Sequence, residues 1–114
     1  MHVEVRHSDD VIVVDLIGDL VAGDGDEMLR EVIDELLGEG WKKIVLNLAG
    51  VHRMDSSGVG ELVAGWKLAD EFGAAIKLLR PGDRVKSTLH LSQILPLVEV
   101  FEDEAEAVRH FGAS

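Results

Sequence analysis

The first part of the chain has two short stretches in which the apolar positions are those of strands. Residues 3–7 alternate apolar and polar side chains, and residues 11–17 are rich in β-branched side chains. The intervening residues 8–10, Ser-Asp-Asp, have the composition of a tight turn. Two strands joined by so short a turn predict an antiparallel hairpin, and we expect Gly18 to end the second strand.

Apolar residues at helical spacing then predict four helices, at 24–37, 57–72, 83–90 and from 103 onward. Asp24 and Glu27 form a capping-box pattern before the first helix, and Asp83 is the expected cap of the third. The side chains expected to face the core are Met28, Leu29, Val32, Ile33, Leu36, Leu37, Val59, Leu62, Val63, Trp66, Ala69, Val85, Leu89, Ala105, Val108 and Phe111.

Three further apolar runs, at 43–48, 75–80 and 97–101, predict strands between these helices. Strands that alternate with helices form parallel sheets through right-handed crossovers. The sequence therefore predicts one α/β domain over residues 1–114, with a mixed, mostly parallel sheet, an N-terminal antiparallel hairpin and about four helices.

Charge narrows the range of partners. The chain has 22 acidic and 11 basic residues, a formal net charge of −11, which argues against nucleic-acid binding. Residues 1–40 hold 12 of the acidic residues and only two of the basic ones. This acidic region is either a solvated face that keeps the protein soluble or a surface that steers a basic partner.

Composition also limits the possible sites. The chain has no cysteine, so disulfides and thiolate metal centres are excluded, and its five histidines show no metal-binding spacing. No apolar run approaches 18 residues, and the N-terminus shows no signal pattern. We expect a cytoplasmic protein with no membrane association, no metal and no cofactor.

The most distinctive segment is the expected loop at 49–60, between the strand at 43–48 and the helix that follows. In open α/β sheets, sites gather where parallel strands end and helices begin. An acidic residue, two hydroxyls and two glycines meet there: Asp55, Ser56, Ser57, Gly58 and Gly60. Helix capping explains one of these polar residues, and glycines in a first turn suit the close approach of another backbone.

These residues carry a family resemblance. The run Asp55-Ser56-Ser57-Gly58-Val59-Gly60, the Gly18-Asp19-Leu20 turn and the Gly73 helix stop resemble the STAS-domain anti-sigma-factor antagonists over the whole chain. The resemblance implies a STAS-like fold and a non-enzymatic phospho-switch. In that family the serine after the Asp, here Ser56, is phosphorylated, and Ser57 is then the expected helix cap.

The resemblance also implies the partners. The unphosphorylated protein would bind a serine-kinase anti-sigma factor of histidine-kinase-like ATPase fold and so release a sigma factor. Phosphorylation would reverse this binding, and a serine phosphatase would reset the switch. The expected partner-binding residues are Asp55, Ser56, Ser57, Gly58, Gly60 and Glu61.

Two positions depart from the family pattern. Val21 stands where an acidic residue is common, so no partner contact is carried over to it. Glu61 stands where relatives often have an aliphatic residue, on or near the surface that the partner would meet, which indicates an altered choice of partner.

Other functions remain open. A STAS domain can also be a scaffold subunit of a signalling assembly or a subunit of a lipid-transport complex. A hydrolase with Ser56 as its nucleophile and His52 or His90 as the base lacks the Gly-x-Ser-x-Gly elbow and is disfavoured. We expect a monomer or a weakly associating dimer.

Overall fold

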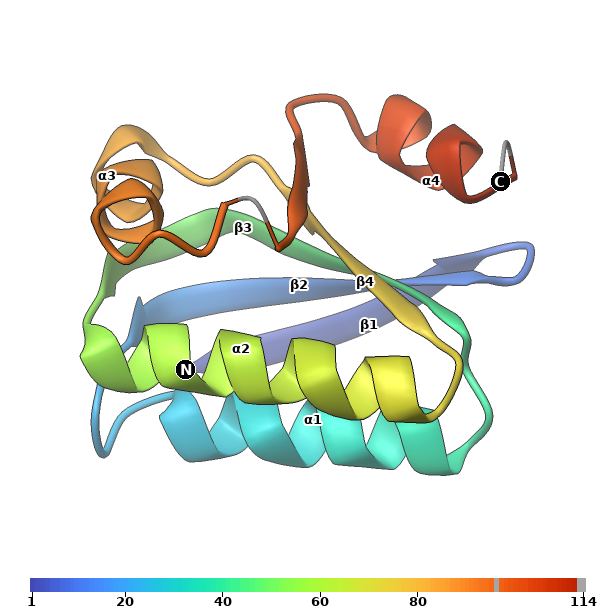
Figure 1. Ribbon diagram of the computed structural model, residues 1–114, viewed down its shortest axis with the longest axis horizontal. Helices are drawn as coiled ribbons and strands as arrows, with labels where there is room; N and C mark the ends of the chain where they lie inside the picture. The colour runs from blue at the N-terminus through green and yellow to red at the C-terminus, as the bar shows by residue number, and fades with distance from the viewer. Residues whose placement is uncertain (96, 113–114) are drawn as a thin grey trace.

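A computed structural model describes residues 1–95 and 97–112 of the chain. Five strands and four helices follow one another in the predicted order (Figure 1). They are β1 His2–Ser8, β2 Val11–Leu20, α1 Asp26–Gly38, β3 Lys43–Met54, α2 Ser56–Glu71, β4 Ala75–Leu79, α3 Asp83–Leu91, β5 Glu99–Phe101 and α4 Glu104–Gly112.

The strands form one sheet in the order β1-β2-β3-β4-β5. β1 and β2 are antiparallel, and all other neighbouring strands are parallel, as predicted. Because side chains alternate across a strand, Ile12 and Val14 of β2 belong to one apolar cluster and Val11 and Val13 to another. The sheet therefore has a core on each face.

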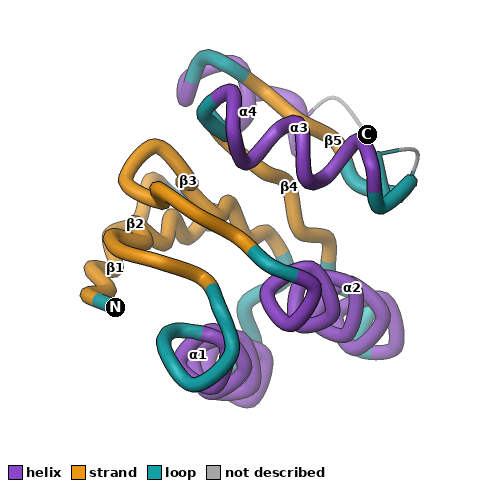
Figure 2. Tube along the Cα trace, turned by 90° about the vertical axis from the view of Figure 1, so that its left-hand side faces the viewer, coloured by secondary structure: helices purple, strands orange, loops and turns teal. Residues whose placement is uncertain are grey.

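The two cores differ in the helices that cover them. The larger core contains buried side chains of α1, α2 and α3, and the smaller one is closed by Ala107 and Phe111 of α4. α1 and α2 lie together on one side of the strands, apart from α4 (Figure 2). Both helices run in the same direction, side by side along the sheet (Figure 1).

Most of the predicted core is confirmed, with two exceptions. Met28 is 39% exposed, and Ala105 is exposed whereas its neighbour Ala107 is fully buried. Both errors have the same cause. Met28 and Ala105 lie at the edge of the apolar face of their helices, and whether such a residue is buried depends on the rotation of the helix about its axis. The spacing of apolar residues alone does not define that rotation.

Two strands continue beyond their predicted ends. β2 runs to Leu20 through Gly18, which has a φ of 125° next to shifts in the β2–β3 register. β3 runs to Met54, so residues 49–54, expected to be a loop, are strand. The glycine is accommodated as an irregularity in a continuing ladder and does not end it. As a result, Asp55 follows directly from a strand paired with Leu20.

The predicted caps of two helices are wrong. The residue before α1 is Gly25, with a φ of 103° and no side-chain capping bond, so Asp24 and Glu27 form no capping box. Asp24 is held instead in a tight turn by paired backbone hydrogen bonds with Val21. The cap position of α3 is Gly82, and Asp83 is the first residue of that helix.

Candidate functional site

The site predicted from the sequence lies where β3 ends and α2 begins. Asp55 is the N-cap residue of α2, with extended backbone angles, and its Oδ1 accepts hydrogen bonds from the N–H groups of Ser57 (2.9 Å) and Gly58 (3.1 Å). These are two of the donors that a helix leaves unpaired at its start. The prediction that Ser57 is the cap is therefore wrong, because Asp55 holds that position.

The same carboxylate reaches a second element. Its Oδ2 accepts a hydrogen bond from the backbone N–H of Ala22 at 3.1 Å, and the Asp55 N–H donates to the carbonyl of Leu20 at 3.3 Å. These bonds hold the β2–α1 turn against the first turn of α2. The hydrogen bond from Ala22, followed by those from Gly58 and Ser57, lowers the pKa of Asp55 below its ordinary value, so the side chain is anionic at neutral pH.

Ser56, the expected phosphate acceptor, is the first residue of α2 and is exposed, whereas Ser57 is half-buried. Within residues 1–95 and 97–112, nothing forms a hydrogen bond with the Ser56 hydroxyl, and neither His52 nor His90 is paired with it. Among the described residues, therefore, no histidine is placed to activate this hydroxyl, and the Ser56 side chain faces solvent.

The two glycines of the motif have different surroundings. A Cβ atom at Gly58 would lie 2.3 Å from the carbonyl oxygen of Leu20, whereas one at Gly60 would meet nothing within 4 Å. The close backbone approach inferred from these glycines is therefore made at Gly58 by the chain itself. Gly60 leaves an open, exposed stretch of helix one turn beyond Ser56.

Glu61 lies at the interface between α2 and α1. Its side chain is only 12% exposed and forms an ion pair with Arg30 of α1. Arg30 Nε donates to Glu61 Oε2 at 3.1 Å, and a second bond joins the Arg30 guanidinium to Oε1. The sequence placed Glu61 on or near the partner surface, and the structure adds that its carboxylate is already engaged within the chain.

Two contributions to the site were missed in the sequence. Ala22 acts through its backbone N–H, so its side chain gave no signal. The guanidinium of Arg53 in β3 donates a hydrogen bond to the Asp19 carboxylate of β2 at 3.0 Å. This ion pair joins the C-terminal ends of the two strands next to the site. The opposite charges of the two side chains could have suggested this pair, but only if the extension of both strands had been recognised.

The described part of the chain shows neither a metal site nor a membrane span. Among its residues, no group of three or more histidine, aspartate or glutamate side chains is placed to hold a metal ion. None of the helices in the described ranges combines the length and the apolar character needed to cross a bilayer.

Comparison with known proteins agrees with this architecture. The model of the STAS domain family matches residues 2–107. A Thermotoga neapolitana homologue of the protein TM1081 is 31% identical over 77 residues, 68% of each chain. The anti-sigma F factor antagonist of Paenibacillus polymyxa is 24% identical over 108 residues, which cover 95% of this chain and 92% of that protein.

Solved structures extend the similarity to three dimensions. The crystal structure of TM1081 from Thermotoga maritima superposes with a TM-score of 0.87 at 26% identity, covering 95% of this chain and 92% of that one. The anti-sigma factor antagonist SpoIIAA in its unphosphorylated form gives a TM-score of 0.82 at 23% identity, over 99% and 98% of the two chains, which is a similarity of fold.

Proposed function

The chain belongs to the STAS-domain family, among its anti-sigma factor antagonists, and we propose that it is a non-enzymatic phospho-switch with Ser56 as the phosphate acceptor. In its unphosphorylated form it binds a serine-kinase anti-sigma factor of histidine-kinase-like ATPase fold, which releases a sigma factor. The kinase phosphorylates Ser56 and frees itself, and a serine phosphatase restores the hydroxyl.

One observation carries this proposal: the hydroxyl of Ser56 is exposed on α2, beside a carboxylate that already occupies the start of that helix. Asp55 takes the N–H groups of Ser57 and Gly58, which would otherwise be available to an anion. A phosphate on Ser56 would therefore add roughly −1.5 to −2 charges next to an existing anion. The anion-binding position at the start of α2 is therefore already occupied by the Asp55 carboxylate.

This arrangement explains how a phosphate would release the partner. A surface that packs on a neutral hydroxyl would have to bury an unpaired dianion, which costs several kcal/mol. Moving a complex from almost fully bound to almost fully free requires about 5.5 kcal/mol of differential affinity. Burial of the phosphate can supply a penalty of that size with the scaffold unchanged.

The proposed contact surface combines the motif with its neighbours. Ser56 and Gly60 are exposed and would meet the partner directly. Asp55 and Gly58 would act mainly by fixing the first turn of α2, because their contacts are within the chain. Glu61, at the interface between α1 and α2, and the half-buried Ser57 would contact the partner only with the part of each side chain that is exposed.

The remaining features of the proposal follow from this role. The chain is a substrate and contributes no catalytic group or cofactor, and it acts in the cytoplasm as a single domain over residues 1–114. Bacillus SpoIIAA, a protein of the same fold, has been solved in a phosphorylated form, which supports a phosphate on this scaffold.

Calorimetric titration of the partner kinase with unmodified and Ser56-phosphorylated protein tests the switch. We expect tight binding to the unmodified protein and a loss of about 10⁴-fold in affinity on phosphorylation, which corresponds to about 5.5 kcal/mol. Equal affinity for the two forms would contradict the switch and would favour a scaffold or transport-complex subunit.

A further inference from the structure

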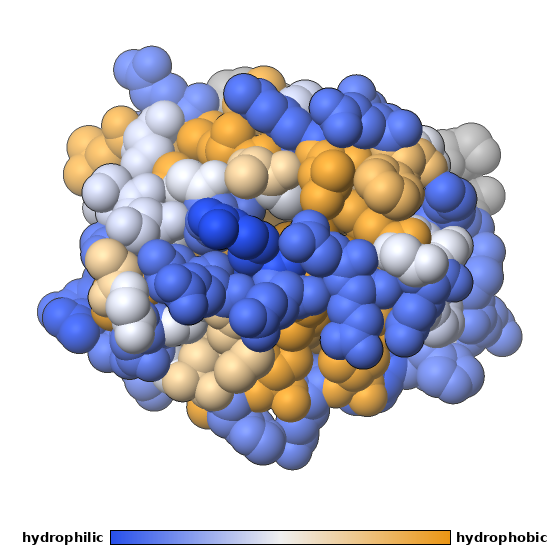
Figure 3. Space-filling view, turned by 90° about the horizontal axis from the view of Figure 1, so that it is seen from below, coloured by the Kyte–Doolittle hydropathy of each residue, from blue (hydrophilic) through white to orange (hydrophobic). Residues whose placement is uncertain are grey.

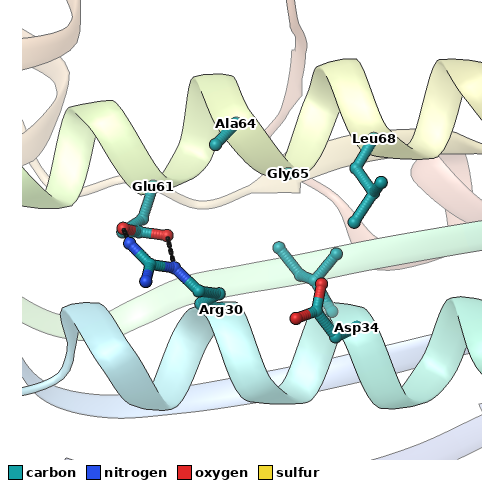
Figure 4. Close-up of a pocket in the computed structure, with 7 residues that line it drawn as sticks. Arg30, Asp34, Glu61, Ala64, Gly65 and Leu68 are labelled. Atoms are coloured by element: carbon teal, nitrogen blue, oxygen red, sulfur yellow. Dashed lines mark hydrogen bonds and ion pairs between the residues drawn. The ribbon is translucent and has the colours of Figure 1, made fainter.

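A groove runs between α1 and α2 on the face of these helices that points away from the sheet. It encloses about 230 Å³ and has an apolar lining from Ile33 of α1 and Ala64, Gly65 and Leu68 of α2. The Arg30–Glu61 ion pair crosses between the helices on one side of these residues, and Asp34 stands on the α1 rim (Figure 4).

Small residues on α2 create this groove. A Cβ atom at Gly65 would lie 2.5 Å from Cδ1 of Ile33, so the two helices approach closely there. Ala64 is exposed and Leu68 is half-buried, which leaves an apolar floor open to solvent. The volume is below the roughly 300–1,000 Å³ of typical small-molecule pockets, and it suits one or two side chains of a protein partner better.

Acidic side chains occupy the exposed positions of α1. Four of its exposed carboxylates form no ion pair with any residue in the described ranges, namely Glu27, Glu31, Asp34 and Glu35. Asp34 lines the groove itself, whereas Glu27 and Glu31 line a separate hollow with Met1, and Glu35 lines another beside Trp41. Arg30 is the one basic residue of α1, and Glu61 already neutralises it. Seen from this side, the molecule shows a band of hydrophilic side chains with hydrophobic patches on both sides (Figure 3).

The carboxylates at the C-terminal ends of α1 and α2 do not stabilise these helices. Neither α1 nor α2 has a basic residue in its last turn, and Glu35 and Glu71 stand there instead. A carboxylate near a helix C-terminus is unfavourable because the helix dipole presents negative charge at that end. An uncompensated acidic surface beside an apolar groove is complementary to a basic amphipathic segment.

We propose that the α1–α2 groove docks an amphipathic helix of a protein partner. Aliphatic side chains at helical spacing would enter between Ile33 and Leu68, and a Lys or Arg side chain beside them would face Asp34 on the α1 rim. Ser56 does not line the groove, so this docking surface is additional to the proposed switch and does not depend on phosphorylation.

A designed peptide tests the chemistry of this surface directly. The probe is a labelled helical peptide of about 16 residues, long enough to be helical, with leucines at positions i, i+4 and i+7 and lysines around them. In a ¹⁵N-labelled sample of the protein, we expect its titration to shift the amide signals of Ile33, Asp34, Gly65 and Leu68. Peptides with alanine for leucine, or glutamate for lysine, should bind at least about tenfold more weakly.

Matched variants distinguish binding of the peptide in the groove from non-specific electrostatic attraction to an acidic protein. Ala64→Trp fills the groove and should weaken binding at least about tenfold, whereas Ala105→Trp, at an exposed alanine of α4, should not. Asp34→Lys should weaken binding more than Asp70→Lys, which makes the same charge change at an exposed position outside the lining. Circular dichroism verifies that each variant is folded.

No binding by the peptide, shifts that map elsewhere, or equal binding to Ala64→Trp and Ala105→Trp would each overturn the docking proposal. The assay uses neither kinase nor phosphate, so its failure leaves the switch at Ser56 standing. Conversely, a protein that is never phosphorylated at Ser56 would still bind the peptide.

Discussion

The carboxylate of Asp55 accepts a hydrogen bond from the backbone N–H of Ala22, although the two residues are 33 positions apart. Its other oxygen caps α2. One side chain thus connects the β2–α1 turn to the helix that carries Ser56. The exposed residue Ser56 therefore lies on a surface built from both segments.

Replacement of Asp55 by alanine should destabilise the protein, because it removes the helix cap and the bond to Ala22 together. Ser57→Ala is the matched control, since Ser57 takes part in the cap only through its backbone N–H. We expect a clear fall in the urea midpoint for Asp55→Ala and little change for Ser57→Ala. Equal losses would show that the Ser57 hydroxyl caps the helix after all.

The two glycines of the motif should respond in opposite directions to alanine. Gly58→Ala places a methyl group 2.3 Å from the Leu20 carbonyl and should cost about 1–3 kcal/mol. Gly60→Ala meets open space within α2 and should raise stability by about 0.5–1 kcal/mol. Thermal and urea unfolding of both variants measure these changes.

The same pair of variants tests the proposed partner surface. If the partner packs closely on Gly60, Gly60→Ala should bind the kinase more weakly despite its greater stability. A Gly60→Ala protein that is more stable and binds equally well would remove Gly60 from the interface.

Acid should destabilise the protein through the cluster around Arg6. Hydrogen bonds from Arg6 lower the pKa values of Asp15 and Glu104, which it joins across β1, β2 and α4. The unfolded chain therefore binds more protons than the folded one at mildly acidic pH. This stabilisation is complete above the ordinary carboxyl pKa of about 4 and is lost as the pH falls through the lower folded values.

Urea unfolding at several pH values measures this dependence. We expect the urea concentration at the unfolding midpoint to decrease once the pH is lowered below about 4. This decrease should be smaller in Arg6→Met, because that variant lacks the guanidinium that lowers the two carboxyl pKa values. Lys67→Met, which removes an exposed lysine of α2 that forms no ion pair within the described ranges, is the control for loss of a cation. An Arg6→Met protein with an unchanged pH profile would show that the cluster does not set the acid response.

Phosphorylation should leave the scaffold intact. Asp55 already occupies the N–H groups of Ser57 and Gly58, so a phosphate on Ser56 has local consequences: repulsion of that carboxylate and strain on its bond to Ala22. We expect amide chemical-shift changes at Ala22 and in the first turn of α2. Broad changes across β2 and β3 would instead indicate a switch by conformational change.

Much of the fold could be predicted because the sheet and helices have clear periodicities. The apolar run at 43–48 and the stripe through Leu29, Ile33 and Leu36 define elements whose burial the structure confirms. The ends of β2 and β3 could not be predicted, because pairing between the strands carries each of them past residues that would otherwise favour a turn. Gly18 is such a residue.

The predicted place of the motif, where a strand ends and a helix begins, is confirmed, but the predicted helix cap is wrong. The position of the motif at a helix start follows from the residue types, whereas the choice of Asp55 over Ser57 as cap depends on where the strand stops. The contact between Ala22 and Asp55 uses the backbone N–H of Ala22, which no residue type in the sequence could indicate. Glu61 could be recognised as unusual, but its pairing with Arg30 depends on how α1 and α2 pack.

Mapping of phosphate by mass spectrometry tests the central claim most directly. The protein and its Ser56→Ala and Ser57→Ala variants are incubated with candidate serine-kinase anti-sigma factors and ATP. We predict one phosphate at Ser56 in the unmodified sequence and in Ser57→Ala, and none in Ser56→Ala. Phosphate on Ser57 alone, or no phosphate with any of these kinases, would contradict the assignment of Ser56 as the acceptor.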